Sequence, residues 1–102
     1  MATEISVFDS SEFEELIAQR DLRISKALVE TVLKNLKGRK RHIHAMSVLI
    51  ENEETIYDIT IDRNDFLKTL EGNLSIYEQY ELFEGCVEIV KAINFLKSKT
   101  KE

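Results

Sequence analysis

The chain has 102 residues, of which 43% are hydrophobic and 32% are charged, a composition typical of one folded domain rather than of a disordered chain. Its net charge of −5 disfavours general attraction to nucleic acid, and no apolar run approaches the ~18 residues of a membrane span. The acidic N-terminus is unlike a signal peptide, and the single cysteine, Cys86, excludes an internal disulfide. We therefore expect a single domain over residues 1–102 in the cytoplasm.

Capping signals and apolar spacing predict two helices in the first third of the chain. The first helix is predicted to begin at Ser10 or Ser11 and to end near Arg20, and Ser11 and Glu14 are spaced as a capping box for it. A second helix, roughly residues 21–37, aligns apolar side chains at three- and four-residue spacing, and Gly38 is expected to end it in the left-handed conformation. Residues 1–9 precede both helices, and we interpret them as a flexible N-terminal segment.

Residues 41–50 and 54–62 are predicted to form an antiparallel hairpin around the polar turn ENEE. Strict alternation along the first strand would place apolar side chains on both of its faces, namely Ile43, Ala45 and Leu49 on one and Met46, Val48 and Ile50 on the other. A lone hairpin is marginal in water, so other parts of the protein must cover this strand on both sides.

The C-terminal third is predicted as two helices of unequal length. Asp62 or Asn64 would cap a short helix that ends at Gly72, and a capping signal at Ser75 would open a long helix over residues 76–98. The apolar positions of the long helix span an arc of about 200°, which is wider than packing on one side requires. We therefore expect this helix to be shared with another chain, with Tyr77 as an exposed aromatic residue away from the arc.

These elements predict an α+β fold in the order α-α-β-β-α-α, with an antiparallel hairpin packed among helices and a long C-terminal helix. A dimer is expected, either because two hairpins meet across a two-fold axis or because two C-terminal helices pack together. The alternative is a monomer whose own helices wrap the hairpin. The residues expected to mediate self-association are Met46, Val48, Ile50, Leu82, Cys86, Ile89 and Ile93.

The most basic stretch, KNLKGRKRHIH over residues 34–44, joins the second helix to the first strand. Its candidate nucleic-acid or anion-binding residues are Lys37, Arg39, Lys40, Arg41, His42 and His44. Clustered cations can contact phosphates, and the histidines could stack on bases. The competing interpretation is a solvated joint in which the lysines of the last helical turn complement the helix dipole.

Enzymatic chemistry finds little support in the sequence. The pair His42 and His44 alternates on one strand face and could hold a metal ion with a carboxylate from Asp58 or Asp62, but three adjacent cations would oppose a dication. Cys86 lies in the apolar arc, where a cysteine acts as a small hydrophobic side chain. No nucleophile-elbow or phosphate-loop glycine pattern is present. We expect neither an enzyme nor a metal or cofactor.

The favoured hypothesis is a small regulatory or adaptor protein that acts by protein–protein binding and self-association. The acidic, amphipathic N-terminal stretch EISVFDSSEFEELI resembles a segment that docks with another protein. The alternative is a nucleic-acid-binding regulator that uses residues 37–41. Nothing in the sequence indicates a membrane partner.

Overall fold

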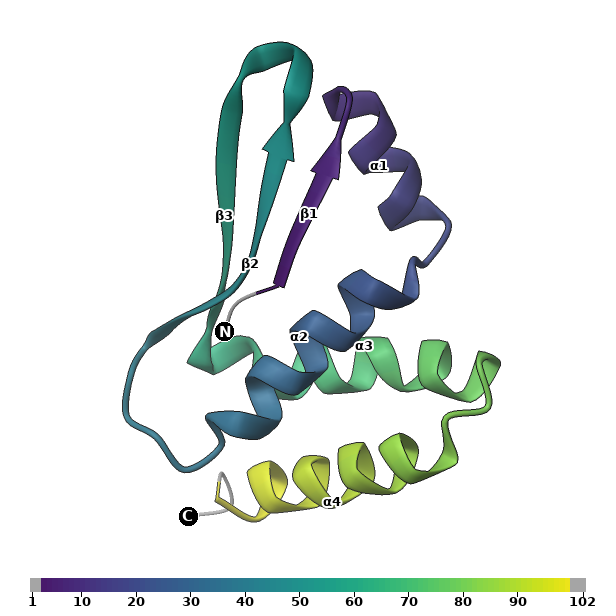
Figure 1. Cartoon of the computed structure of the whole chain (residues 1–102). Coiled ribbons are helices and arrows are strands. Elements are labelled where there is room, and N and C mark those ends of the chain that lie inside the picture. Colours follow the sequence, from purple (N-terminus) through teal and green to yellow (C-terminus); the bar gives the residue numbers. More distant parts are fainter. Residues whose placement is uncertain (1–2, 100–102) are drawn as a thin grey trace.

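Three strands and four α-helices make up residues 3–99, the part of the chain that the computed structural model describes (Figure 1). The elements in chain order are β1 (Thr3–Val7), α1 (Ser10–Ala18), α2 (Leu22–Lys34), β2 (His42–Ile50), β3 (Thr55–Asp62), α3 (Phe66–Gln79) and α4 (Phe83–Lys99). Short 3-10 helices, η1 (Glu51–Glu53) and η2 (Arg63–Asp65), flank β3. The class is α+β, as predicted, but the order of elements begins with a strand.

The prediction of a two-stranded hairpin is wrong, because β1 joins the sheet. The strand order is β1-β2-β3, with β1 parallel to β2 and β2 antiparallel to β3. Ile5 and Val7 point into the core and lie in register with Val48 and Ile50 of β2. The hairpin itself forms near the predicted bounds. The segment that we interpreted as flexible therefore contains an edge strand over residues 3–7, and its first two residues lie outside the described part.

A β-bulge corrects the prediction that β2 is apolar on two faces. His44 is in register with Thr60 and Met46 with Ile59, so Ala45 is the extra residue. Both Ala45 and Met46 are buried, because a bulge lets the strand keep its apolar side chains on one side. The opposite face of β2 exposes His42, His44 and Leu49. The sheet thus has one covered and one open face, so the argument that two hairpins must meet in a dimer no longer holds.

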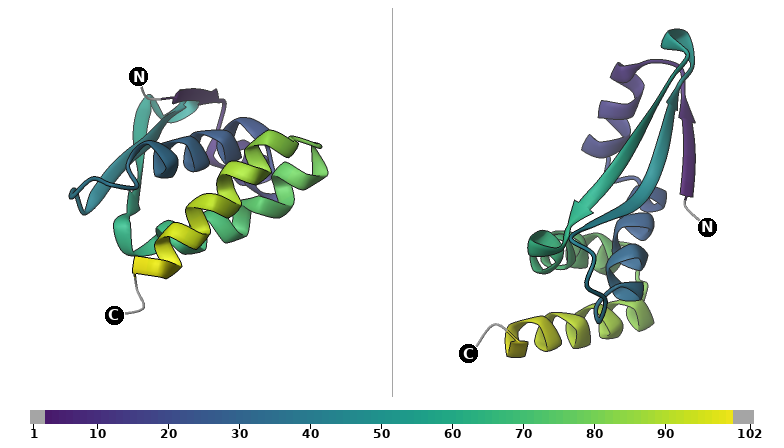
Figure 2. Two further views of the ribbon diagram at one scale, coloured as in Figure 1. Left: turned by 90° about the horizontal axis from the view of Figure 1, so that it is seen from below. Right: turned by 90° about the vertical axis from the view of Figure 1, so that its left-hand side faces the viewer.

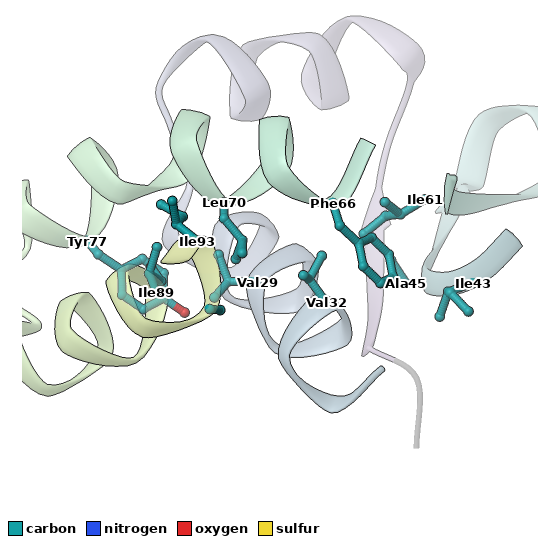
Figure 3. Close-up of a cluster of buried hydrophobic side chains, with 11 residues drawn as sticks. Val29, Val32, Ile43, Ala45, Ile61, Phe66, Leu70, Tyr77, Ile89 and Ile93 are labelled. Carbon is teal, nitrogen blue, oxygen red and sulfur yellow. The ribbon is translucent and has the colours of Figure 1, made fainter. Parts of the chain in front are cut away.

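Two clusters of buried side chains form the core. The larger cluster joins α2, α3 and α4 to the lower end of the sheet and is drawn in Figure 3; it contains Val29, Val32, Ile43, Ala45, Ile61, Phe66, Leu70, Tyr77, Ile89, Ala92 and Ile93. The smaller cluster lies between the sheet, α1 and the first half of α2, and it contains Ile5, Val7, Ala27, Met46, Val48 and Ile50. The protein is consequently elongated, 48 × 31 × 20 Å, with the sheet and α1 at one end and α2–α4 at the other (Figure 2).

Helix α1 begins at Ser10, one of its two predicted starts, but its cap and the end of α2 differ from the predicted ones. The N-cap of α1 is Asp9, whose carboxylate accepts a 2.9 Å hydrogen bond from the backbone N–H of Glu12, so the predicted capping box at Ser11 is wrong. Helix α2 ends at Lys34 rather than near 37, and no described glycine has a positive φ, so Gly38 is not a left-handed cap. The basic stretch after Lys34 is therefore a loop.

The long helix predicted over residues 76–98 is also wrong. Helix α3 continues through Gly72 to Gln79, and the chain then reverses at Glu81, which has a φ of 57°, before α4 begins. Tyr77 is buried rather than exposed, and its ring packs against Gly85 so closely that a Cβ there would lie 2.6 Å from two ring carbons. This contact lies where α4 folds back along α3 (Figure 1). A continuous helix over residues 76–98 could not make this packing of α4 against α3.

Candidate interaction surfaces

The solvent side of α4 carries a straight apolar stripe. Phe83, Val87 and Val90 are 64%, 53% and 44% exposed, and at 100° per residue they fall within an arc of about 60°. The opposite side of the same helix buries Ile89 and Ile93 in the larger core cluster. Helix α4 is therefore apolar on both sides, and only one side is covered within residues 3–99. We call the three exposed residues the α4 stripe.

The structure distributes the predicted self-association residues between core and partly covered positions. Met46, Val48, Ile50, Ile89 and Ile93 are buried in the chain's own core. Leu82 and Cys86 are half-buried and pack against the larger cluster. The five buried side chains have almost no accessible surface to offer a partner. The exposed residues of α4 were within the predicted apolar arc, but alternation and spacing alone did not show which side of the helix faces water.

The basic loop, residues 35–41, lies between α2 and β2, and it exposes Lys37, Arg39, Lys40 and Arg41. The guanidinium of Arg63 holds this loop from the beginning of η2. Its Nε donates to the carbonyl of Lys40 at 2.6 Å and its Nη1 to the carbonyl of Asn35 at 2.7 Å. The guanidinium also lies 4.9 Å from the ring centroid of Phe66. The backbone of the loop is therefore fixed, while its cationic side chains point into water.

Arg63 was missed by the sequence interpretation, and no local signal could have identified it. It is distant in sequence from the loop and resembles any other basic residue next to a turn. Its Nη2 is buried without a hydrogen-bond partner, and a Cβ at Gly38 would lie 3.1 Å from that atom. Gly38 is consequently explained by the close approach of this guanidinium rather than by a helix cap.

The two histidines lie on the open face of the sheet and contact separate carboxylates. His42 Nδ1 is 3.7 Å from Asp62, which Arg41 also approaches at 3.7 Å, whereas His44 Nε2 is 3.2 Å from Asp58. Within residues 3–99, no three His, Cys, Asp or Glu side chains converge as a metal site would require. The structure does bring each histidine next to the aspartate that was considered as a co-ligand.

Ser47 joins His44 and Asp58 in a small polar cluster that the sequence interpretation did not identify. The Ser47 hydroxyl donates to Asp58 Oδ1 at 2.8 Å, and His44 Nε2 lies 3.2 Å from both that oxygen and Ser47 Oγ. The hydrogen bond from Ser47, followed by the contact with His44, lowers the pKa of the Asp58 carboxyl. In a catalytic triad the imidazole lies between hydroxyl and carboxylate, whereas here the hydroxyl is bonded directly to the carboxylate.

An apolar groove of about 390 Å³ separates α1 from β3. Phe13 and Ile17 of α1 form one wall, Tyr57 and Ile59 of β3 form the other, and Val48 lies at the floor. Ile17 and Tyr57 are 53% and 51% exposed, because α1 covers β1 and β2 but leaves the outer part of β3 open. The remaining lining residues are Ser10, Glu14 and Ile50. We call this feature the α1–β3 groove.

Charge is divided between the two ends of the protein. Residues 3–19 contain five acids, Glu4, Asp9, Glu12, Glu14 and Glu15, and residues 42–62 contain five more, Glu51, Glu53, Glu54, Asp58 and Asp62. Neither segment contains a lysine or arginine, so all fourteen lie elsewhere in the chain. The sheet and α1 are consequently strongly acidic, and one of these acids, Glu14, lines the α1–β3 groove.

None of the helices in residues 3–99 is both long and apolar enough to cross a membrane. Searches against protein-family models, curated proteins and solved structures find no match to this chain.

Proposed function

We propose that this chain is a non-enzymatic cytoplasmic adaptor that binds proteins and pairs with a second copy of itself through α4. The observation that carries the proposal is the α4 stripe, because aligned large apolar side chains on a solvent face are a feature of interaction surfaces. A helix that is apolar on both sides is stabilised when a second helix covers the exposed side.

The charges beside the stripe favour an antiparallel pair of α4 helices. Glu84 and Lys91 are both exposed and, being seven residues apart, lie on the same flank of the helix within about 20° of one another. An antiparallel pair centred between Val87 and Glu88 would place Glu84 of each copy beside Lys91 of the other. A parallel pair would instead place Glu84 and Lys91 of the two copies on opposite sides of the interface, where neither charge meets a partner. In the antiparallel register, Phe83 packs near Val90 of the second copy.

The chemistry of the remaining polar groups supports a role in binding rather than in catalysis. The hydroxyl of Ser47 donates to Asp58, and His44 Nε2 lies 3.2 Å from the same hydroxyl, so the three groups are not ordered as hydroxyl, imidazole and carboxylate. Asp58 is exposed on an open sheet face, where water competes for every charged intermediate. Cys86 is a lone, half-buried thiol among apolar neighbours, which is compatible with a reducing compartment.

The test is the mass of the purified chain in solution, measured by sedimentation equilibrium over a range of concentrations. We expect the wild type to shift from one chain to two as the concentration rises. Val87→Glu, which buries a charge in the proposed interface, should weaken the dissociation constant by at least about tenfold. Thr60→Glu adds the same charge on the open sheet face and should leave the equilibrium unchanged. A wild type that stays at the mass of one chain throughout would contradict the proposal.

Charge reversal tests the antiparallel orientation separately. Glu84→Lys and Lys91→Glu should each weaken self-association, because each opposes like charges in both copies of the pair. The double variant should restore it, since the two unlike contacts are re-formed with exchanged signs. If the double variant associates no better than either single one, the two residues do not meet across the interface and the proposed register is wrong.

The alternative function is nucleic-acid binding by the basic loop, and one observation favours it. Arg63 fixes the loop backbone, so the four exposed cations of residues 37–41 are held together at little further cost in conformational entropy. Such a loop would bind phosphates with a marked salt dependence. An electrophoretic shift with single- and double-stranded probes at low salt, lost in a variant with Arg39, Lys40 and Arg41 all changed to glutamate, would support this function. Absence of any shift at low salt would count against it.

A further inference from the structure

We infer that the α1–β3 groove and the free edge of β3 together bind an extended segment of another protein, one that alternates apolar with basic residues. The segment would add to the sheet as a fourth strand beside β3. This site is distinct from the α4 stripe, which lies at the other end of the elongated molecule (Figure 1). The inference therefore does not depend on self-association.

The first argument is the edge of β3. It is the last strand of the sheet, so its outer backbone N–H and C=O groups pair with no strand in residues 3–99. Edge strands are usually protected by charged side chains, above all lysine, by proline or by a bulge. The sequence TIYDITID contains neither lysine nor proline, and its two charged residues, Asp58 and Asp62, are acidic. The irregularity of the β2–β3 pair lies in β2, between His44 and Met46, so the edge of β3 itself is unblocked. Strand addition satisfies such an edge directly.

The second argument is the apolar surface on both sides of this edge. Ile56 and Tyr57 are neighbours in β3, point to opposite faces of the sheet and are 65% and 51% exposed. An added strand would lie about 4.8 Å beyond β3. Its side chains on the helix side would contact Tyr57 and the groove, including Ile17, while those on the open side would lie beside Ile56. Apolar residues on the helix side therefore give the segment its anchors.

The third argument is charge. Residues 3–19 and 42–62 hold ten acids and no lysine or arginine, so this end of the protein is negatively charged, although Glu4 lies on the far edge strand and Asp62 lies beside Arg41. Glu14 lines the groove, and Glu53 lies beside Tyr57, its carboxylate 3.4 Å from the phenolic oxygen. Asp58 lies on β3 itself, on the open face. In an added strand whose apolar residues face the helices, lysine and arginine project from the open face towards Asp58. Glu14 and Glu53, on the helix side, add to the negative potential that would repel an acidic segment.

A second copy of this chain fits the site poorly. Antiparallel pairing of two β3 strands would bring two acidic ends together, with Asp58 of each copy near the other strand. The chain's own basic stretch cannot serve as the added strand, because residues 35–41 form a loop held by Arg63 and the following residues belong to the central strand β2. A separate protein that supplies a basic, apolar strand is the occupant that charge and topology favour.

The test uses a fluorescently labelled octapeptide that alternates valine with lysine or arginine, titrated with the full chain and followed by anisotropy. A peptide of the same composition with its valines and cations in separate blocks controls for charge alone. We expect the alternating peptide to bind at least about tenfold more tightly than the block peptide. Ile17→Lys and Tyr57→Lys, both at exposed positions, should each weaken binding of the alternating peptide by about tenfold, and Val87→Glu should not change it.

Backbone methylation of the peptide tests strand addition itself. N-methylation at every second residue blocks one of the two edges that a strand presents. We expect one of the two alternate methylation patterns to abolish binding and the other to leave it intact, with slowed amide exchange in β3 when the unmethylated peptide is bound. Equal binding of alternating and block peptides, or full binding to Ile17→Lys, would overturn the inference. Loss of self-association in Ile17→Lys would also overturn it, because a second copy would then occupy the groove.

Discussion

Replacing Gly85 by alanine should destabilise the protein, although alanine is the better helix former. Gly85 lies in the first turns of α4, where the ring of Tyr77 packs against its backbone. An added Cβ would lie 2.6 Å from both Cδ2 and Cε2 of that ring, a separation that real Cβ atoms essentially never show. Tyr77 is buried in the larger core cluster and cannot swing into solvent without losing its contacts. Either the ring or the start of α4 must therefore move.

The size of the effect follows from two opposing terms. Overpacking of a core contact costs about 1–3 kcal/mol, and replacing glycine by alanine within a helix gains about 1 kcal/mol. We expect a net loss of up to about 2 kcal/mol in the free energy of unfolding, which corresponds to a fall in Tm of up to roughly 16 °C for a domain of this size. Urea denaturation followed by circular dichroism measures the free energy, and a thermal scan measures the Tm.

Gly72→Ala is the matched control. Gly72 lies inside α3, and a Cβ there would meet nothing within 4 Å, so alanine should stabilise the protein by up to about 1 kcal/mol. In a Tyr77→Ala background, Gly85→Ala should lose its penalty and become neutral or stabilising. If Gly85→Ala is as stable as Gly72→Ala in the otherwise unchanged protein, the close packing of α3 on α4 described above is wrong.

Three further predictions concern stability and can be measured by denaturant unfolding. Arg63→Lys should lower the free energy of unfolding by about 2 kcal/mol, because a lysine cannot donate to the carbonyls of both Asn35 and Lys40. Arg39→Lys, in the exposed part of the loop, should be neutral. Equal effects of the two substitutions would refute the anchoring role of Arg63. Burial, followed by the charges of nearby glutamates, raises the pKa of Tyr77 to about 12 from 10.0. The phenol of the unfolded state therefore loses its proton at a lower pH than that of the folded state. The free energy of unfolding should fall by up to about 2 kcal/mol as the pH rises from 10.0 to about 12. Tyr77→Phe should abolish that component, and an unchanged pH dependence would contradict it. Asp9→Ala should cost about 1 kcal/mol in the free energy of unfolding through loss of the α1 cap, and Ser11→Ala should cost less. A larger loss in Ser11→Ala than in Asp9→Ala would instead support the capping box expected from the sequence.

The sequence predicted the hairpin and two of the helices because their signals are local. Alternation between residues 41 and 62 and the spacing of apolar residues in α2 do not depend on distant parts of the chain. By contrast, β1 is a short segment whose strand character depends on pairing Ile5 and Val7 with β2. That pairing is parallel and long-range, and a parallel partner leaves no turn signal between the two strands.

The prediction that glycines mark the ends of the helices was wrong. The three described residues with positive φ are Arg20, Glu54 and Glu81, whereas no described glycine adopts this conformation. A non-glycine residue in the left-handed region carries a cost of about 1 kcal/mol that the surrounding packing must offset. At Glu81 the offsetting contact is the fold of α4 onto α3, which no local pattern records. The same limit applies to the interaction surfaces, since the covered and exposed sides of α4 are distinguished only by its packing.

Cysteine cross-linking at position 87 tests most directly whether two copies meet through α4. In a Cys86→Ala background, Val87→Cys lies next to the two-fold axis of the proposed antiparallel pair, whereas Asn94→Cys in one copy would lie roughly 20 Å along the helix from the same position in the other. We predict that mild oxidation converts the Val87→Cys protein to a disulfide-linked dimer and leaves the Asn94→Cys protein as single chains. Failure of Val87→Cys to cross-link, or equal cross-linking at both positions, would contradict the account.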